Sequence, residues 1–405
     1  MKISFNIKIK NLIPLIFILG SLISLEDQAH IIIFQLSATL SIVLFFFQSL
    51  NNNFSNFITE RKFSFFITSF ILSSILSSLI VFSEVTLVRL LFLSTCLLTC
   101  FNSAYGSDIN SLYKNILNSI LIITPLIILL SLIYANFEIN RFEGFMGNPN
   151  AFGRFCAFMI PVYFINIRES LQKKLVFQFS DYFNILIFFL LVFLSFFTNS
   201  RATYLLIFIF LASLFCYNFK FSNLLKFSLN SFFNKVLSLF IIFSLFIGVY
   251  FIGAYDGIIE KTRLLNIAKE SEIFGTIDIT NGRSALIDKG LATISSNFFG
   301  VDSNQKNLDE MNYYDAHNNY LNFAIKYGVI NSFLFHSLFL YFLIYFYRSK
   351  NKDNLRLLGF ILTAQLLIYW IVETAAVIYP VWLIISIYCI SRQKDNKKNK
   401  KQNLI

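Results

Sequence analysis

Long runs of apolar residues recur from one end of this chain to the other, and polar residues gather in the segments between them. Most of these runs approach the roughly 20 residues that a helix needs to cross a bilayer, and the alternating segments of about ten residues typical of membrane barrels are absent. The pattern therefore predicts an all-α, polytopic integral membrane protein. We expect about 12 transmembrane helices, at residues 11–25, 30–50, 62–83, 85–103, 116–135, 150–167, 182–199, 202–218, 236–255, 318–347, 355–373 and 375–390.

The composition and the charge distribution agree with this pattern. The chain is 56% hydrophobic, with 52 phenylalanines. Lysines and arginines concentrate in every second loop, whereas the alternate short loops and adjoining helix ends hold few of them, among them Arg141, Arg154 and Arg201. Because cytoplasmic loops carry the excess of positive charge, both termini are predicted to be cytoplasmic.

The net charge of +11 follows from inner loops that face an anionic leaflet, so it does not indicate a nucleic-acid partner. Residues 391–405 form a basic cytoplasmic tail, which we expect to be solvated and disordered. The five cysteines lie in or beside apolar helices without metal-ligand spacing. They predict neither a disulfide framework nor a zinc site, and no cofactor is indicated.

One long polar segment, residues 256–317, interrupts the apolar pattern and lies on the outer, periplasmic side in this topology. It divides the chain into a membrane domain of nine helices (1–255), the loop, a membrane domain of three helices (318–390) and the tail. Within the loop, residues 280–283 supply capping groups for a short amphipathic helix at Ser284–Ile294, and residues 297–302 predict a turn.

His317 lies where this loop meets the next apolar helix, and it is one of three histidines. A histidine at that position either anchors the start of the helix or takes a proton from a hydroxyl group. Asp315 is close enough in sequence to orient the imidazole, and Asn318 could bind a sugar or a phosphate. His30 and His336 stand alone in apolar helices, and we expect both to be structural.

Three arginines on the same side are candidates for binding an anion. Arg201 is the only charged residue between Asp181 and Lys220; it either extends toward lipid headgroups or binds a phosphate. Arg283 precedes the predicted loop helix and either binds a phosphate or forms a surface ion pair. Arg154 follows the helix-start signal at residues 148–150, for which capping is the alternative explanation. One base with several arginines suits transfer to a hydroxyl from a phosphate-linked donor.

These residues resemble the O-antigen ligase/polymerase family of bacterial inner-membrane proteins. The resemblance covers most of the chain and rests on five fragments in order: Gly147–Asn150, Thr198–Arg201, Asn281–Arg283, Asn297–Val301, and His317-Asn318 with Gly328. It implies metal-independent, inverting glycosyl transfer from an undecaprenyl diphosphate-linked donor to a lipid or saccharide acceptor. His317 would then be the base, and Arg201 and Arg283 would bind the diphosphate.

The resemblance leaves ligase and polymerase as alternatives. The ligase pattern places a Gly, Thr or Tyr three residues after Gly328, where this chain has Asn331, but His317-Asn318, Gly328 and the spacing from Arg201 to Leu205 fit. The polymerase pattern of Arg, ten residues and Gly fails from both Arg201 and Arg283. The sequence therefore favours a ligase. A lipid-linked glycan transporter remains a second alternative, although transporters usually carry charges near the membrane midplane.

Overall fold

The computed structural model describes residues 9–23, 28–51, 61–133, 142–173, 178–198, 200–218, 283–302, 318–349, 353–373 and 379–402. Throughout these ranges the regular structure is helical, with no strand. The helices are α1 (Ile9–Ile23), α2 (Gln28–Asn51), α3 (Arg61–Val81), α4 (Glu84–Tyr105), α5 (Ile109–Ile133), η1 (Gly144–Met146), α6 (Pro149–Lys173), α7 (Phe179–Phe197), α8 (Arg201–Asn218), α12 (Arg283–Ser296), α14 (Asn319–Tyr327), α15 (Val329–Arg348), α16 (Asn354–Val372) and α17 (Tyr379–Gln402).

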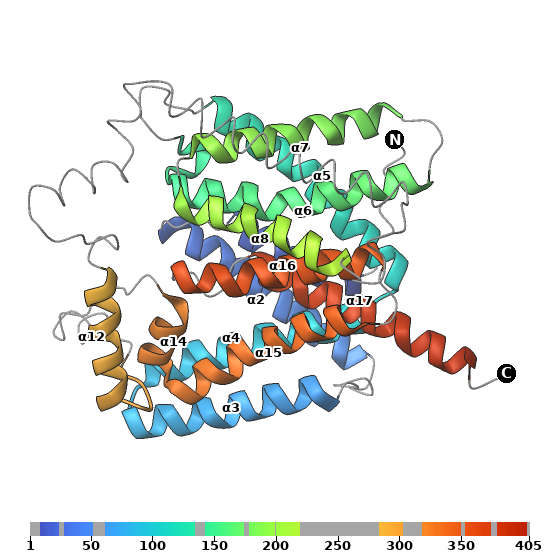
Figure 1. Cartoon of the computed structure of the whole chain (residues 1–405). Coiled ribbons are helices and arrows are strands. Elements are labelled where there is room, and N and C mark those ends of the chain that lie inside the picture. The colour runs from blue at the N-terminus through green and yellow to red at the C-terminus, as the bar shows by residue number, and fades with distance from the viewer. Residues whose placement is uncertain are drawn as a thin grey trace, which may run out of the picture.

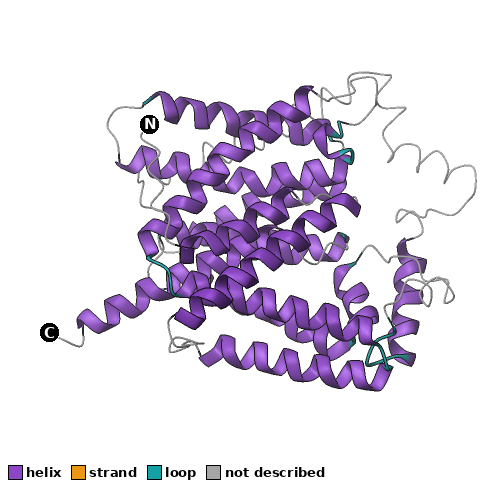
Figure 2. Cartoon of the chain, turned by 180° about the vertical axis from the view of Figure 1, so that it is seen from behind, coloured by secondary structure: helices purple, strands orange, loops and turns teal. Residues whose placement is uncertain are grey.

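The long helices run alongside one another as a bundle, and α12 lies crosswise at one end of it (Figures 1 and 2). We call this the α12 end; α17 extends out of the bundle at the opposite, Lys394 end. Helices α6 and α16 are largely buried, whereas α2, α3, α5 and α7 expose rows of Leu, Ile and Phe. Exposed apolar rows of this size fit helices that face lipid.

Seven of the described helices are long and apolar enough to cross a membrane: α3, α4, α5, α6, α7, α15 and α16. Together with the shorter apolar α1, α2 and α8, they support a multi-pass membrane protein. The expected total of about 12 stays a prediction, because the helix expected at 236–255 and most of the loop at 256–317 lie outside the described residues.

Contacts near the helix ends form two groups, one at each end of the bundle. These groups match the two sides of the membrane that were predicted from the loop charges. At the α12 end, the Ser83 hydroxyl donates to Asp302 at 2.5 Å, and the Phe142 amide donates to the Phe197 carbonyl at 2.8 Å. At the Lys394 end, Asn354 donates to Gln172 at 2.9 Å. Segments that charge assigned to opposite sides of the membrane are thus at opposite ends of the bundle.

Two sequence predictions are wrong in detail. The single helix expected at 318–347 is two helices, α14 and α15, because Gly328 adopts φ +93° and ψ +153°, a conformation that no helix contains. The tail expected to be disordered continues α17 as far as Gln402. Its first turns pack on the bundle, where Gln393 donates to the Ala104 carbonyl at 3.2 Å, so the helix has a surface on which to form.

Candidate functional site

The C-terminal end of α16 binds one of the candidate residues, Arg154, through Tyr369. Arg154, in the second turn of α6, is only 6% exposed. Its guanidinium donates to the Tyr369 hydroxyl at 2.5 Å and lies 5.5 Å from the centroid of that ring. A buried arginine requires such partners, because an uncompensated charge in a low-dielectric interior is costly. The structure thus places a cation inside the α12 end of the bundle.

The motif at residues 147–150 explains how α6 begins. Gly147 adopts the left-handed conformation (φ +61°), and the Asn148 carboxamide oxygen accepts from the Asn150 amide at 2.8 Å. These residues therefore cap α6, which confirms the capping interpretation of the sequence. A methyl group on Gly153 would lie 2.0 Å from the Thr203 hydroxyl, so the first turns of α6 and α8 nearly touch. The start of α8, at Arg201, consequently lies beside the turn that carries Arg154.

Helix α14 approaches the same region from the other side. The Asn318 side chain caps it by accepting from the Leu321 amide at 3.1 Å. The Tyr320 hydroxyl donates to the Leu367 carbonyl of α16 at 3.0 Å. Burial raises the pKa of Tyr320 to about 12, so this hydroxyl stays neutral and keeps its donor role at physiological pH. The first turn of α14 is thereby fixed against the end of α16.

His336 has a structural role that its position in the sequence did not explain. Its Nδ1 lies 2.6 Å from the Ser332 carbonyl oxygen, and its Nε2 lies 3.1 Å from the side-chain carboxamide nitrogen of Asn319. The partners assign the tautomer: Nδ1–H donates to the carbonyl, and Nε2 accepts from Asn319. Because both ring nitrogens are occupied, His336 holds the start of α14 on α15 and is not available as a base.

The loop helix α12 is attached to the membrane helices at the break between α14 and α15. The Val301 amide donates to the Ile325 carbonyl at 2.8 Å, and the Val329 amide donates to the Phe298 carbonyl at 3.0 Å. Gly300 and Gly328 both have positive φ and face each other's backbone. Since α12 and α14 lie side by side and end at this junction, their N-termini, at Arg283 and Asn319, point the same way (Figure 1).

Asn331, which departs from the ligase pattern, joins α15 to α3. It is fully buried, and its carboxamide donates to the Ser77 hydroxyl at 3.2 Å and accepts from the Ser74 hydroxyl at 3.3 Å. Polar pairs of this kind hold helices together in a membrane, where water cannot satisfy them. The residue at this position therefore reflects the packing of α3 on α15.

Restoring the ligase pattern with Asn331→Gly is expected to destabilise the protein by about 1–3 kcal/mol, because the buried hydrogen bonds of Asn331 with Ser77 and Ser74 are lost. Ser337→Gly in the same helix is the matched control and should cost at most about 0.5 kcal/mol, the propensity term alone. Unfolding in detergent micelles measures both. Equal losses for the two variants would show that the contacts of Asn331 contribute nothing.

The structure describes four of the six predicted site residues. Arg154 is buried as described, Asn318 is the cap of α14, and Arg201 and Arg283 are the first residues of α8 and α12. His317 and Asp315 lie outside the described residues, and His317 directly precedes Asn318. The roles of all six as substrate ligands or base stay predictions. Sequence reasoning missed Tyr369, Tyr320 and Asn319, which lack any local motif and become neighbours only through helix packing.

One segment of the chain is similar to a known protein family. No curated protein matches the chain. Residues 186–336 match the family model described as O-antigen ligase (Wzy_C). This segment runs from within α7 to His336 and therefore contains Arg201, Arg283, His317 and Asn318. Residues 186–336 of this helical membrane protein are thus similar to the O-antigen ligase family.

Proposed function

We propose that this protein is an O-antigen ligase-like glycosyltransferase with its active site at the α12 end of the bundle, facing the periplasm. It transfers a glycan from undecaprenyl diphosphate to a hydroxyl of an acceptor such as the lipid A core. The acceptor oxygen attacks the anomeric carbon from the face opposite the diphosphate, which inverts the configuration. The bond from that carbon to the diphosphate breaks, and the acceptor proton passes to His317.

Helix N-termini support a donor site at this end. Helices α8, α12 and α14 all begin here, and each N-terminus carries a partial positive charge with amides that lack partners within the helix. Two of these helices begin with an arginine, Arg201 and Arg283. The planar guanidinium matches the oxygens of a phosphate. In the proposal both arginines hold the diphosphate and stabilise the charge that it gains on leaving.

Buried contacts support an acceptor site next to the donor site. His317 precedes the cap of α14, and the first turn of that helix is held by the bonds from Asn319 to His336 and from Tyr320 to Leu367. A base on such a fixed support keeps its distance from the reacting atoms, which is worth a large part of the catalytic effect. Asp315 would orient the imidazole and Asn318 would bind the sugar.

Arg154 contributes to the electrostatics of the proposed site. It lies within the α12 end, where its guanidinium donates a hydrogen bond to Tyr369. A buried cation in a low-dielectric region acts on an anion over a longer distance than an exposed one. In the proposal Arg154 attracts the diphosphate, and no metal ion takes part.

The single observation that carries the proposal is the family match, because residues 186–336 include both donor arginines and the base. A ligase is favoured over a polymerase of the same family because His317-Asn318, Gly328 and the spacing from Arg201 to Leu205 fit the ligase pattern, whereas the polymerase spacing fails from both arginines.

Deletion of the protein from its host, followed by analysis of carrier-linked and surface glycans on gels, tests this proposal. A ligase predicts that long carrier-linked chains accumulate and that capped lipid disappears. Capping with single repeats would indicate a polymerase instead. Accumulation of carrier-linked glycan on the cytoplasmic face would indicate a transporter and contradict the proposal.

A further inference from the structure

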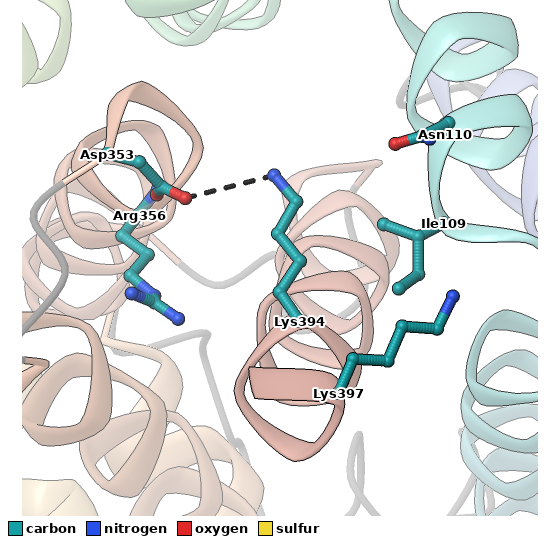
Figure 3. Close-up of a pocket in the computed structure, with 6 residues that line it drawn as sticks. All are labelled: Ile109, Asn110, Asp353, Arg356, Lys394 and Lys397. Carbon is teal, nitrogen blue, oxygen red and sulfur yellow. Dashed lines mark hydrogen bonds and ion pairs between the residues drawn. The ribbon is translucent and has the colours of Figure 1, made fainter. Parts of the chain in front are cut away.

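The Lys394 end of the bundle contains a cavity that glycosyl transfer does not use. Its volume is about 220 Å³, and it is lined by Ile109, Asn110, Asp353, Arg356, Lys394 and Lys397. Figure 3 shows how these residues come from three helices: the start of α5, the start of α16, and α17. The volume corresponds to about seven water molecules, so the cavity has room for a small polar group.

The lining is cationic. Three of the six residues are basic and one is acidic. Arg356, 1% exposed, forms an ion pair with Asp395 at 2.5 Å, which fixes its position in the wall. The Lys394 Nζ lies 3.8 Å from the Asp353 Oδ2, which is long for an ion pair, and both side chains are partly exposed. Within the described part of the chain, Lys397 has no ion pair or hydrogen bond. The cavity therefore carries an excess of positive charge.

The helical tail creates this arrangement. Lys394 and Lys397 are three residues apart, so on a helix they share one face, and that face is turned toward the cavity (Figure 3). A disordered tail would leave the two charges in solvent. Two helix N-termini, those of α5 and α16, also border the cavity and add partial positive charge.

The position of the cavity along the bundle indicates which kind of ligand it can bind. Helix α16 has 19 residues, so it spans about 28 Å, close to the thickness of the hydrocarbon core of a bilayer. Its first residues, which line the cavity, then lie at the level of the lipid phosphates. Basic pockets between transmembrane helices on the cytoplasmic side are suited to phospholipid headgroups.

We propose that this cavity binds the phosphodiester headgroup of an anionic glycerophospholipid from the leaflet at the Lys394 end. Lys394 and Lys397 contact the phosphate oxygens, and Arg356, fixed by its ion pair with Asp395, forms the wall behind them. The bound headgroup in turn holds the part of α17 that carries these two lysines against α5 and α16. This site is separate from the proposed transfer site, so it can be tested without a transfer assay.

Native mass spectrometry of the purified full chain, titrated with phosphatidylglycerol or phosphatidylcholine, tests this proposal. We expect tighter binding of phosphatidylglycerol. The K394Q/K397Q variant should bind it about 25-fold more weakly, at about fivefold for each lysine. Lys289→Gln, an exposed lysine on α12 at the other end, is the matched control and should leave binding unchanged.

Three outcomes would overturn the assignment. Equal binding of both lipids would exclude recognition of charge, and equal phosphatidylglycerol binding by wild type and K394Q/K397Q would exclude this cavity. Displacement of the lipid by millimolar inorganic phosphate would show that free phosphate is the ligand. If the double variant does not fold, Lys397→Gln alone supplies the comparison, with a fivefold loss expected.

Discussion

Replacing His317 by alanine is expected to abolish glycan transfer while the amount of folded protein stays the same. A positioned general base accelerates proton transfer by about 10²- to 10⁴-fold, so its loss should leave no detectable capped lipid. The measurement is the surface glycan on gels, together with the protein level in the membrane. His317 precedes Asn318 in the sequence, and the buried partners of Asn319 and Tyr320 are His336 and Leu367.

His30→Ala is the matched control for this variant, because it removes a histidine at the start of α2 for which the sequence indicates only a structural role. It should retain transfer. Surface glycan at wild-type level in His317→Ala would remove His317 as the base. His336 would not replace it, since both of its ring nitrogens are engaged in buried contacts.

Replacing Gly328 by alanine is expected to detach α12 from the bundle and to lower the free energy of unfolding by about 2–6 kcal/mol. The backbone at φ +93° is strained for any L residue, at about 1–3 kcal/mol. In addition, the new methyl group would lie 2.7 Å from the Phe299 carbonyl oxygen. The backbone around Phe299 would have to shift to relieve this clash, which costs about 1–3 kcal/mol of stability. Hydrogen exchange at residues 298–302 and 325–331 should increase sharply.

Gly147→Ala provides the comparison for Gly328→Ala. Gly147 also has a positive φ, +61°, but a methyl group there meets nothing within 4 Å. Only the conformational cost of about 1–2 kcal/mol should remain. If both variants lose the same stability and exchange at residues 298–302 does not change, then the contact between Gly300 and Gly328 does not hold α12 in place.

The described helices were largely predictable from the sequence, because long apolar runs indicate segments buried in lipid. The side of the membrane that each helix end faces stays a prediction. The short helix at Ser284–Ile294 was also predicted, and α12 confirms it with bounds of Arg283–Ser296. What the sequence could not predict are the features that depend on contacts between distant segments. A lone glycine in an apolar run does not indicate a break, and Gly328 ends α14 only because residues 297–301 pack against it.

The candidate site follows the same division. Polarity and position identified Arg154, Arg201 and Arg283 as cations on one side, and the structure brings the helix starts that carry them to one end of the bundle. The contacts of Tyr369 and His336 could not be predicted, because their partners are supplied by other helices: Arg154 by α6 and Asn319 by α14. Likewise, Arg356 and Asp395 are 39 residues apart and form a buried pair that no local pattern indicates.

The most direct test of the central claim is transfer by the purified protein in liposomes that contain an undecaprenyl diphosphate-linked glycan and a hydroxyl-bearing lipid acceptor, with EDTA present. We expect the glycan to appear on the acceptor with release of one undecaprenyl diphosphate per transfer. The His317→Ala protein should form no product. No product from the wild-type protein, or equal product from His317→Ala, would contradict transfer by a histidine base at the α12 end.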